Sequence, residues 1–188
     1  MHRISIEITP FSLLGICVAC LIIPLNLLLA WTIAVVIHEL AHLLILLLCK
    51  TPIHTIKIGI SGTIIETAPM PSFYKFICAA AGPIASLSLV FLVRQAPLLA
   101  LCGLFHGLYN LLPLYPSDGW RMLEGLTHCL RLPDKICIIG EIIASVLMVA
   151  LALFFSIRFH LGALPVYTLL FLLGKQKITC KQRTKKVQ

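Results

Sequence analysis

The sequence has little charge, and acidic residues are especially few. Only 12% of its 188 residues are charged and seven are acidic, whereas 60% are hydrophobic and the mean hydropathy is +1.03. A chain this apolar is excluded from the class of soluble domains. The net charge of +8 comes without an aromatic or basic groove motif, so nucleic-acid binding is not expected. The composition therefore predicts a multi-span membrane protein.

A disulfide framework is also not expected. The eight cysteines fall in apolar runs or on the predicted inner side of the membrane, where thiols stay reduced. Cys17 and Cys20 have CxxC spacing, but inside an apolar helix such a pair is typical of packing.

Six hydrophobic runs indicate an all-α polytopic membrane protein that forms one domain over residues 1–188, ending in a basic tail at 175–188. A bilayer core about 30 Å thick needs roughly 20 apolar residues per helix. The predicted spans are 8–23, 26–49, 73–92, 95–113, 136–155 and 159–173. The last run is short enough for a re-entrant segment as the alternative. A signal peptide is the alternative for residues 1–20, although apolar sequence continues past it.

The basic residues predict the orientation of these spans, because Lys and Arg collect in cytoplasmic loops. With both termini inside, 13 of the 15 basic residues lie on the inner side, and only Arg94 and Arg158 lie outside. This distribution fits six crossings of a cell membrane with both termini in the cytoplasm. The inner set is Arg3, Lys50, Lys57, Lys75, Arg121, Arg131, Lys135, Lys175, Lys177, Lys181, Arg183, Lys185 and Lys186.

The second run contains "HELAH", an HExxH motif, at residues 38–42. On a helix, His38 and His42 project from one face and can bind a single zinc ion. Glu39 can reach a water at the metal and act as general base. An ordinary helix with surface His and Glu would explain the same string, but ionisable groups inside a membrane are costly and are functional by default. We therefore predict a zinc site with one Zn²⁺ per chain.

A catalytic zinc site needs three protein ligands and an open position, so a third ligand must come from elsewhere. The candidate stretch is "NLLPLYPSDGWR", residues 110–121, at the inner end of the fourth run. Its two prolines and glycine break the helix at membrane depth, which is tolerated where the backbone lines a cavity or is covered by protein. Asp118 is the preferred ligand in this stretch. Glu141, about one turn inside the fifth run, is the rival, because an unpaired carboxylate there would be expensive.

Together these two motifs resemble those of the site-2 protease family of intramembrane zinc metalloproteases, over residues 33–130. The family pairs HExxH with an "NxxPxxPxDG" stretch on a later helix. The resemblance implies His38, His42 and Asp118 as zinc ligands and Glu39 as the base. It implies Asn110 as a second catalytic residue, a polar group near the substrate that holds either the substrate or the developing oxyanion. It also implies that Pro113, Pro116 and Gly119 shape the backbone around the ligand.

The chain departs from the family pattern at three positions. Trp120 stands where a second glycine is usual, and Ser117 replaces a common apolar residue. The stretch "AAGPIASL", residues 80–87, resembles the family's "AGPxxN" element, with Ser86 where Asn is common. Small-residue helix packing explains this stretch equally well.

The small size and the six runs most resemble the sporulation subgroup, typified by stage IV sporulation protein FB. That resemblance implies release of a pro-sigma factor from a membrane-associated pro-sequence. It makes a membrane-associated protein substrate and the lipid bilayer the expected partners, with membrane inhibitor or regulatory proteins as further ones. The subgroup usually carries a cytosolic nucleotide-binding module, which is expected to be absent here or supplied in trans.

Two other functional classes remain open. One is a membrane metallopeptidase of the quality-control type with a glutamate as third ligand. The other is a non-enzymatic zinc carrier or an inactive scaffold, in which replacement of Glu39 would change nothing.

Three features near the two motifs lead to further predictions. Ile56, Ile58 and Ile60 alternate with other residues, which predicts a strand after the second run; it is either a substrate-binding edge or a plain connecting hairpin. Polar residues at 121, 124, 128 and 131 predict one face of an interfacial helix, opposite leucines at 123, 126 and 130. His106, one turn before Asn110, either faces the site or packs, and packing is favoured.

Overall fold

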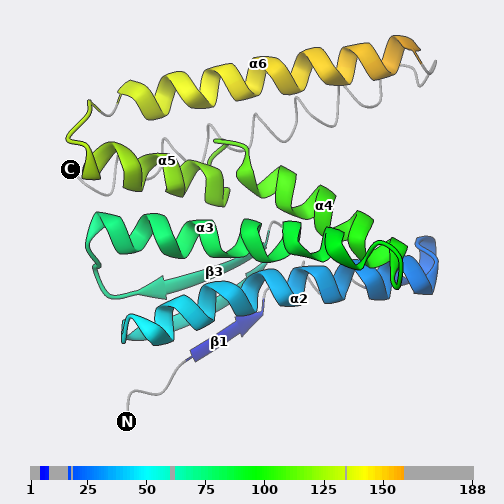
Figure 1. Ribbon diagram of the computed structural model, residues 1–188, viewed down its shortest axis with the longest axis horizontal. Coiled ribbons are helices and arrows are strands. Elements are labelled where there is room, and N and C mark those ends of the chain that lie inside the picture. Colours follow the sequence, from blue (N-terminus) through cyan, green and yellow to red (C-terminus); the bar gives the residue numbers. More distant parts are fainter. Residues whose placement is uncertain (1–4, 9–16, 18, 60–61, 134, 159–188) are drawn as a thin grey trace.

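The structure is a computed structural model that describes residues 5–8, 17, 19–59, 62–133 and 135–158. Its helices run alongside one another, and a small sheet covers one side of α2 and α3 (Figure 1). The first predicted span, 8–23, lies largely outside the described residues, and the sixth, 159–173, lies entirely outside them. The basic tail also lies outside this part of the chain.

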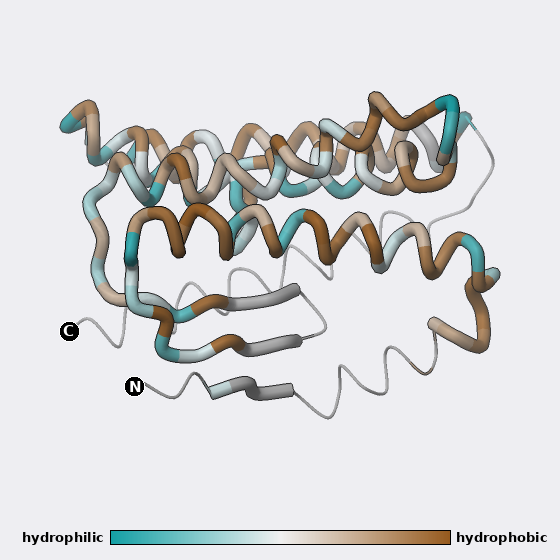
Figure 2. The backbone as a smooth tube through the Cα atoms, turned by 60° about the horizontal axis from the view of Figure 1, so that its bottom comes forward, coloured by the Kyte–Doolittle hydropathy of each residue, from teal (hydrophilic) through white to brown (hydrophobic). Residues whose placement is uncertain are grey.

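Three described helices are long and apolar enough to cross a membrane: α2 (Leu25–Leu48), α3 (Ser72–Ser88) with its 3₁₀ extension η1 (Leu89–Leu92), and α6 (Lys135–Arg158). They correspond to the predicted second, third and fifth spans. Helix α2 follows Pro24 and α3 follows Pro71. Figure 2 shows hydrophobic residues along the helices and more hydrophilic ones near several helix ends. The described residues thus hold three of the six predicted spans.

The predicted fourth span is a broken helix. Helix α4 (Pro97–Leu111) begins with a proline at its first turn, where the missing N–H is no loss. Its 15 residues extend only about 22 Å, less than a bilayer core. After a loop containing Pro113 and Pro116, α5 (Asp118–Cys129) continues in roughly the direction of α4 (Figure 1). The break is where the prolines predicted it.

Helix α5 differs from the predicted interfacial helix. It packs along the first half of α3, and a Cβ on Gly125 would lie 3.0 Å from Phe76 N and 3.1 Å from Ser72 O. Small side chains form the buried side of α5, whereas Leu126 and Leu130 of the expected apolar face are exposed. The leucine pattern misled the prediction because in a helix pair glycine permits the closest backbone approach.

The sheet among the described residues contains three strands in the order β1, β2, β3, of which β1 precedes α2 in the chain and the other two follow it. Strand β2 (Ile53–Gly59) pairs antiparallel with β3 (Gly62–Thr67), which confirms the strand predicted from the isoleucine alternation. Strand β1 (Ser5–Ile8) pairs parallel with β2, with Ser5 opposite Thr55. No strand was predicted there, because four residues are too few for a recognisable alternation.

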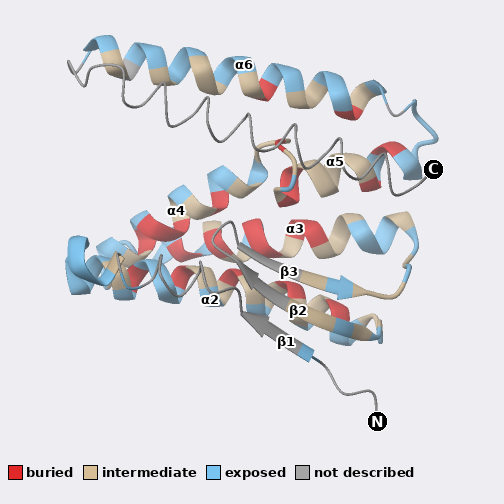
Figure 3. Cartoon of the chain, turned by 180° about the vertical axis from the view of Figure 1, so that it is seen from behind, coloured by how far each residue is buried: buried red, intermediate tan, exposed pale blue. Residues whose placement is uncertain are grey.

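Small residues fill the space between the helices. Ala30 and Ala34 of α2 cluster with Leu89 and with Cys102 of α4. The buried residues face one another on α2, α3 and α4, whereas α6 is mostly exposed (Figure 3). Large apolar side chains such as Leu40 and Leu44 are exposed, as expected for helices whose outer faces meet lipid. The cysteines among the described residues are free thiols.

Candidate metal centre

Two histidines of α2 converge one helical turn apart. His38 and His42 are 2% and 8% exposed, and their Nε2 atoms lie 3.1 Å from each other. They stand ten and six residues before Leu48, which places them about 15 and 9 Å from that end of the helix. Both rings are buried on one face of α2, about two to three turns before its end.

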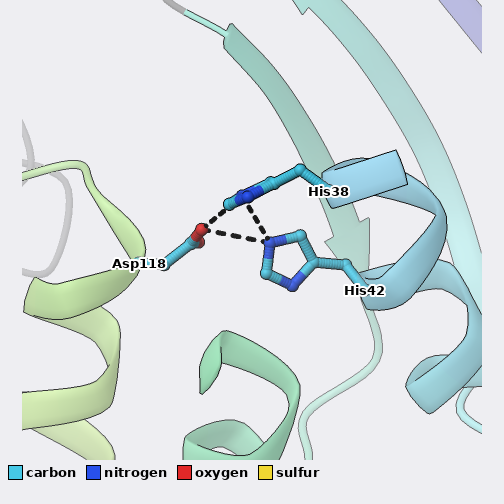
Figure 4. A group of neighbouring side chains, drawn as sticks. All are labelled: His38, His42 and Asp118. Atoms are coloured by element: carbon cyan, nitrogen blue, oxygen red, sulfur yellow. Dashed lines mark hydrogen bonds and ion pairs between the residues drawn. The ribbon is translucent and has the colours of Figure 1, made fainter. Parts of the chain in front are cut away.

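Asp118 reaches the same point from α5. Its Oδ2 lies 2.8 Å from His38 Nε2 and 3.1 Å from His42 Nε2, and the residue is 7% exposed (Figure 4). Asp118 is the first residue of α5, and Ser117 caps the helix by accepting a hydrogen bond from Trp120 N. The Ser117 hydroxyl also donates to the Leu112 carbonyl oxygen. The departure at Ser117 thus serves the local fold, because the hydroxyl ties the start of α5 to the end of α4.

The outer nitrogens of both histidines are held by α3. His42 Nδ1 lies 2.7 Å from the Cys78 carbonyl oxygen, and because a carbonyl only accepts, Nδ1 carries the proton. The lone pair of neutral His42 therefore lies on Nε2, toward Asp118. His38 Nδ1 lies 2.9 Å from the hydroxyl of Ser86, which is fully buried and can accept the same kind of bond. Such outer partners orient metal-binding histidines.

Gly82 and Ser86 contact the two histidines, and the sequence did not assign either of them to the site. A Cβ on Gly82 would lie 2.6 Å from His38 Nε2, so only a glycine lets α3 pass this close to the histidine pair. Ser86 follows one turn later on the same helix. The signal was the "AAGPIASL" stretch, for which helix packing was an equal alternative. In the structure this stretch both packs and contacts the two histidines.

The three side chains suit a zinc ion in number, type and spacing. Among the described residues, His38, His42 and Asp118 form the group of metal-binding side chains whose ligand atoms converge. Zinc bonds of about 2.1 Å in a tetrahedral arrangement separate the ligand atoms by about 3.4 Å. The observed separations of 2.8 and 3.1 Å would need to widen by only about half an ångström. Two nitrogen lone pairs and a carboxylate at this distance repel unless a cation or a proton lies among them.

The other residues singled out from the sequence are not members of this group among the described residues. Glu39 adjoins His38 on α2 and is half-buried. Asn110 is half-buried on α4 and donates hydrogen bonds to His106. His106 contacts the His38 ring, with centroids 4.6 Å apart. Glu141 lies on α6 and is not part of the converging group in the described chain.

Two more side chains complete the surroundings of Asp118. Its second oxygen, Oδ1, lies 4.0 Å from Arg121 Nη1, one turn along α5. Trp120, which stands where the family has a second glycine, packs edge to face on Tyr115 with ring centroids 5.1 Å apart. The indole therefore covers the loop before Asp118.

Comparison with solved structures shows which known fold the chain resembles. No known family profile matches the chain, and no curated protein sequence matches it. Among solved structures, the chain is similar to the site-2 protease from Methanocaldococcus jannaschii, with a TM-score of 0.60 and 21% sequence identity. The alignment covers 94% of this chain and 91% of that one. At this identity the similarity concerns the fold.

Proposed function

We propose that the chain is an intramembrane zinc metalloprotease, which hydrolyses a peptide bond of a membrane-associated substrate near the cytoplasmic face. The observation that carries the proposal is the convergence of His38, His42 and Asp118 on one buried point. Ionisable groups buried between apolar helices are costly, so their presence indicates a function. The fold similarity to a site-2 protease supports the same reaction class.

In the proposed site, His38, His42 and Asp118 are the zinc ligands. A zinc ion held there would supply a Lewis acid that acidifies water and polarises a substrate carbonyl. The Cys78 carbonyl and the Ser86 hydroxyl keep the histidine Nε2 atoms turned inward. The Trp120 and Leu112 contacts of Ser117 hold the start of α5, and with it the Asp118 carboxylate, in place.

Glu39 is the proposed general base and acid. It takes a proton from the attacking water, whose oxygen bonds to the carbonyl carbon, and delivers that proton to the leaving nitrogen as the C–N bond breaks. Its place next to His38 on the same helix keeps it beside the metal ligands. Asn110, one turn beyond His106, is proposed to hold the substrate.

The substrate must be extended at the bond that is cut, because a helix hides its carbonyl groups in internal hydrogen bonds. Strand β3 is at one edge of the sheet and leads through residues 68–71 to α3, which carries Gly82 and Ser86. We propose that the substrate adds to this sheet as a further strand. The class of substrate is a membrane-associated pro-protein, and a pro-sigma factor of sporulation is the member that the sequence resemblance implies.

The two other classes make different demands on the same residues. A metallopeptidase with a glutamate ligand would use Glu141, which is outside the converging group in the described residues. A zinc carrier or inactive scaffold would bind the metal without needing Glu39. The placement of Asp118 in that group argues against the first class, and the need for Glu39, tested below, separates a protease from the second.

The test is co-expression of the chain with candidate membrane-associated pro-proteins, comparing wild type with Glu39→Gln. Wild type should shorten one such substrate, and Glu39→Gln should leave it intact while keeping its zinc. Glu124→Gln, the same change on α5, is the matched control and should process normally. Equal processing by wild type and Glu39→Gln would refute the protease proposal.

A further inference from the structure

His106 of α4 is wedged between two aromatic rings of α2. Its ring centroid lies 4.6 Å from that of His38 and 5.5 Å from that of Trp31, both at near-perpendicular angles of 78° and 83°. It is half-buried and is not one of the three converging side chains. Edge-to-face contacts on both sides fix the position of the imidazole.

One ring nitrogen, Nε2, is turned to Asn110, one turn further along α4. Asn110 Nδ2 lies 3.1 Å from the His106 carbonyl oxygen and 3.2 Å from His106 Nε2. Because a carbonyl oxygen only accepts, the atom beside it must be the NH₂ group, and this fixes which way round the amide lies. The same group then donates to His106 Nε2, so neutral His106 carries its proton on Nδ1.

Both Nδ2 hydrogens of Asn110 are therefore engaged by one residue. Within the described chain these are the hydrogen bonds of its side chain, and Oδ1 keeps its two lone pairs for another partner. A group that stabilises a developing oxyanion must donate a hydrogen bond. Held in this way, Asn110 offers an acceptor, which matches a backbone N–H.

An extended peptide presents backbone N–H and C=O groups alternately on its two sides, and each needs a partner once water is excluded. We infer that His106 is a positioning residue that holds the Asn110 amide so that Oδ1 accepts a backbone N–H of the peptide bound at the metal centre. This inference rests on the proposed function and assigns Asn110 to orientation of the substrate. His106 then acts by orienting Asn110 and does not bind the metal.

A back-bond to the carbonyl four residues earlier is common for a polar side chain on a helix, and alone it restrains one hydrogen only. The second acceptor, Nε2, defines the plane of the amide. Replacement of His106 by Phe keeps a ring between Trp31 and His38 but removes this acceptor. The variant therefore separates the packing of the ring from its hydrogen bond to Asn110.

The experiment uses the full-length chain, zinc-loaded in detergent, and three probes. Acetohydroxamate chelates zinc and has no peptide backbone. A leucyl-leucine hydroxamate adds one internal peptide N–H, and its ester analogue replaces that N–H by oxygen. Dissociation constants for the three probes and the zinc content are measured for wild type, His106→Phe, Asn110→Ala and the double variant.

Wild type should bind the amide probe about fivefold more tightly than the ester, the effect of one hydrogen bond. His106→Phe should lose most of this preference while keeping its zinc and its affinity for acetohydroxamate. The double variant should lose no more than Asn110→Ala, because His106 acts through Asn110.

Three results would overturn the inference. The first is an amide preference that survives in His106→Phe or is missing from wild type. The second is a loss of zinc or of acetohydroxamate affinity in His106→Phe, which would place its effect on the metal ligands. The third is a wild type that binds neither zinc nor acetohydroxamate, and this result alone would remove the proposed function as well.

Discussion

Gly82 of α3 lies directly against the ring nitrogens of His38 and His42 on α2. A side chain at this position would approach His38 Nε2 to 2.6 Å and His42 Nε2 more closely still. Glycine inside a helix costs about 1 kcal/mol relative to alanine, so its presence here needs a reason. The reason is the space at the point where the two Nε2 atoms meet Asp118.

Gly82→Ala should abolish zinc binding although it raises the helix propensity of α3. The added methyl group would displace the two ring nitrogens from their common point with Asp118. Zinc per protein after detergent purification measures the effect. Gly140→Ala on α6 is the control, because its Cβ would meet the flexible end of Leu123 at 2.7 Å and Pro113 Cβ at an ordinary contact distance of 3.9 Å. Full zinc content in Gly82→Ala would show that the metal lies elsewhere.

Ser86→Ala should weaken zinc binding about 10- to 100-fold, the usual effect of removing an outer hydrogen-bond partner from a metal-binding histidine. The variant leaves His38 Nδ1 without its partner at 2.9 Å and frees the ring to rotate. Competition with a chelator of known affinity gives the dissociation constant. Ser88→Ala, two residues on, removes an exposed hydroxyl bonded to Ala85 O and should bind zinc like wild type.

Asp118→Asn should lose zinc and activity, whereas Glu141→Gln should keep both. An amide cannot supply the charge of the carboxylate whose Oδ2 meets the two histidines. Metal content and processing of a pro-protein are measured on the same preparations. The opposite pattern, with zinc kept in Asp118→Asn and lost in Glu141→Gln, would replace the site-2 type by the glutamate-ligand type.

Reporter fusions should place Lys50, Arg131 and Lys186 in the cytoplasm and Arg94 outside. In the structure, α2 ends and α6 begins at one end of the helix bundle, and α3 reaches the other end before Arg94 (Figure 1). The charge asymmetry of the sequence then predicts which end is inside. A fusion after Lys186 that reports the outside would refute six crossings and the orientation of the tail.

The convergence of His38, His42 and Asp118 could be predicted because it depends on short local spacings. His38 and His42 sit four residues apart on a helix, and a proline-broken stretch marks where Asp118 leaves the regular backbone. What spacing cannot give is which element supplies the outer contacts. Cys78 contributes through its carbonyl oxygen, which is the same in every residue, and Ser86 through a hydroxyl that also suits helix packing.

The parts of the fold that depend on the length of an apolar run could be predicted from the sequence. The parts that depend on close packing between helices were harder to predict. The ranges of α2, α3 and α6 follow from hydropathy alone. The position of α5 does not, because Gly125 sets its approach to α3 and glycine carries no hydropathy signal of its own. His106 shows the same limit: one turn of spacing places it near Asn110, but only the packing of α4 on α2 puts its ring against His38.

The parallel pairing of β1 with β2 has a consequence for the order in which the protein is made. Ser5 and Thr55 are 50 residues apart, so synthesis at about 5 to 20 residues per second leaves β1 without its partner strand for roughly 3 to 10 s. Strands β2 and β3 are adjacent in sequence and can pair as soon as both have emerged. Both pairings need β2, so the sheet can begin to form only when that central strand has emerged. A nascent chain stalled before β2 would leave β1 exposed to any chaperone or lipid surface that it meets.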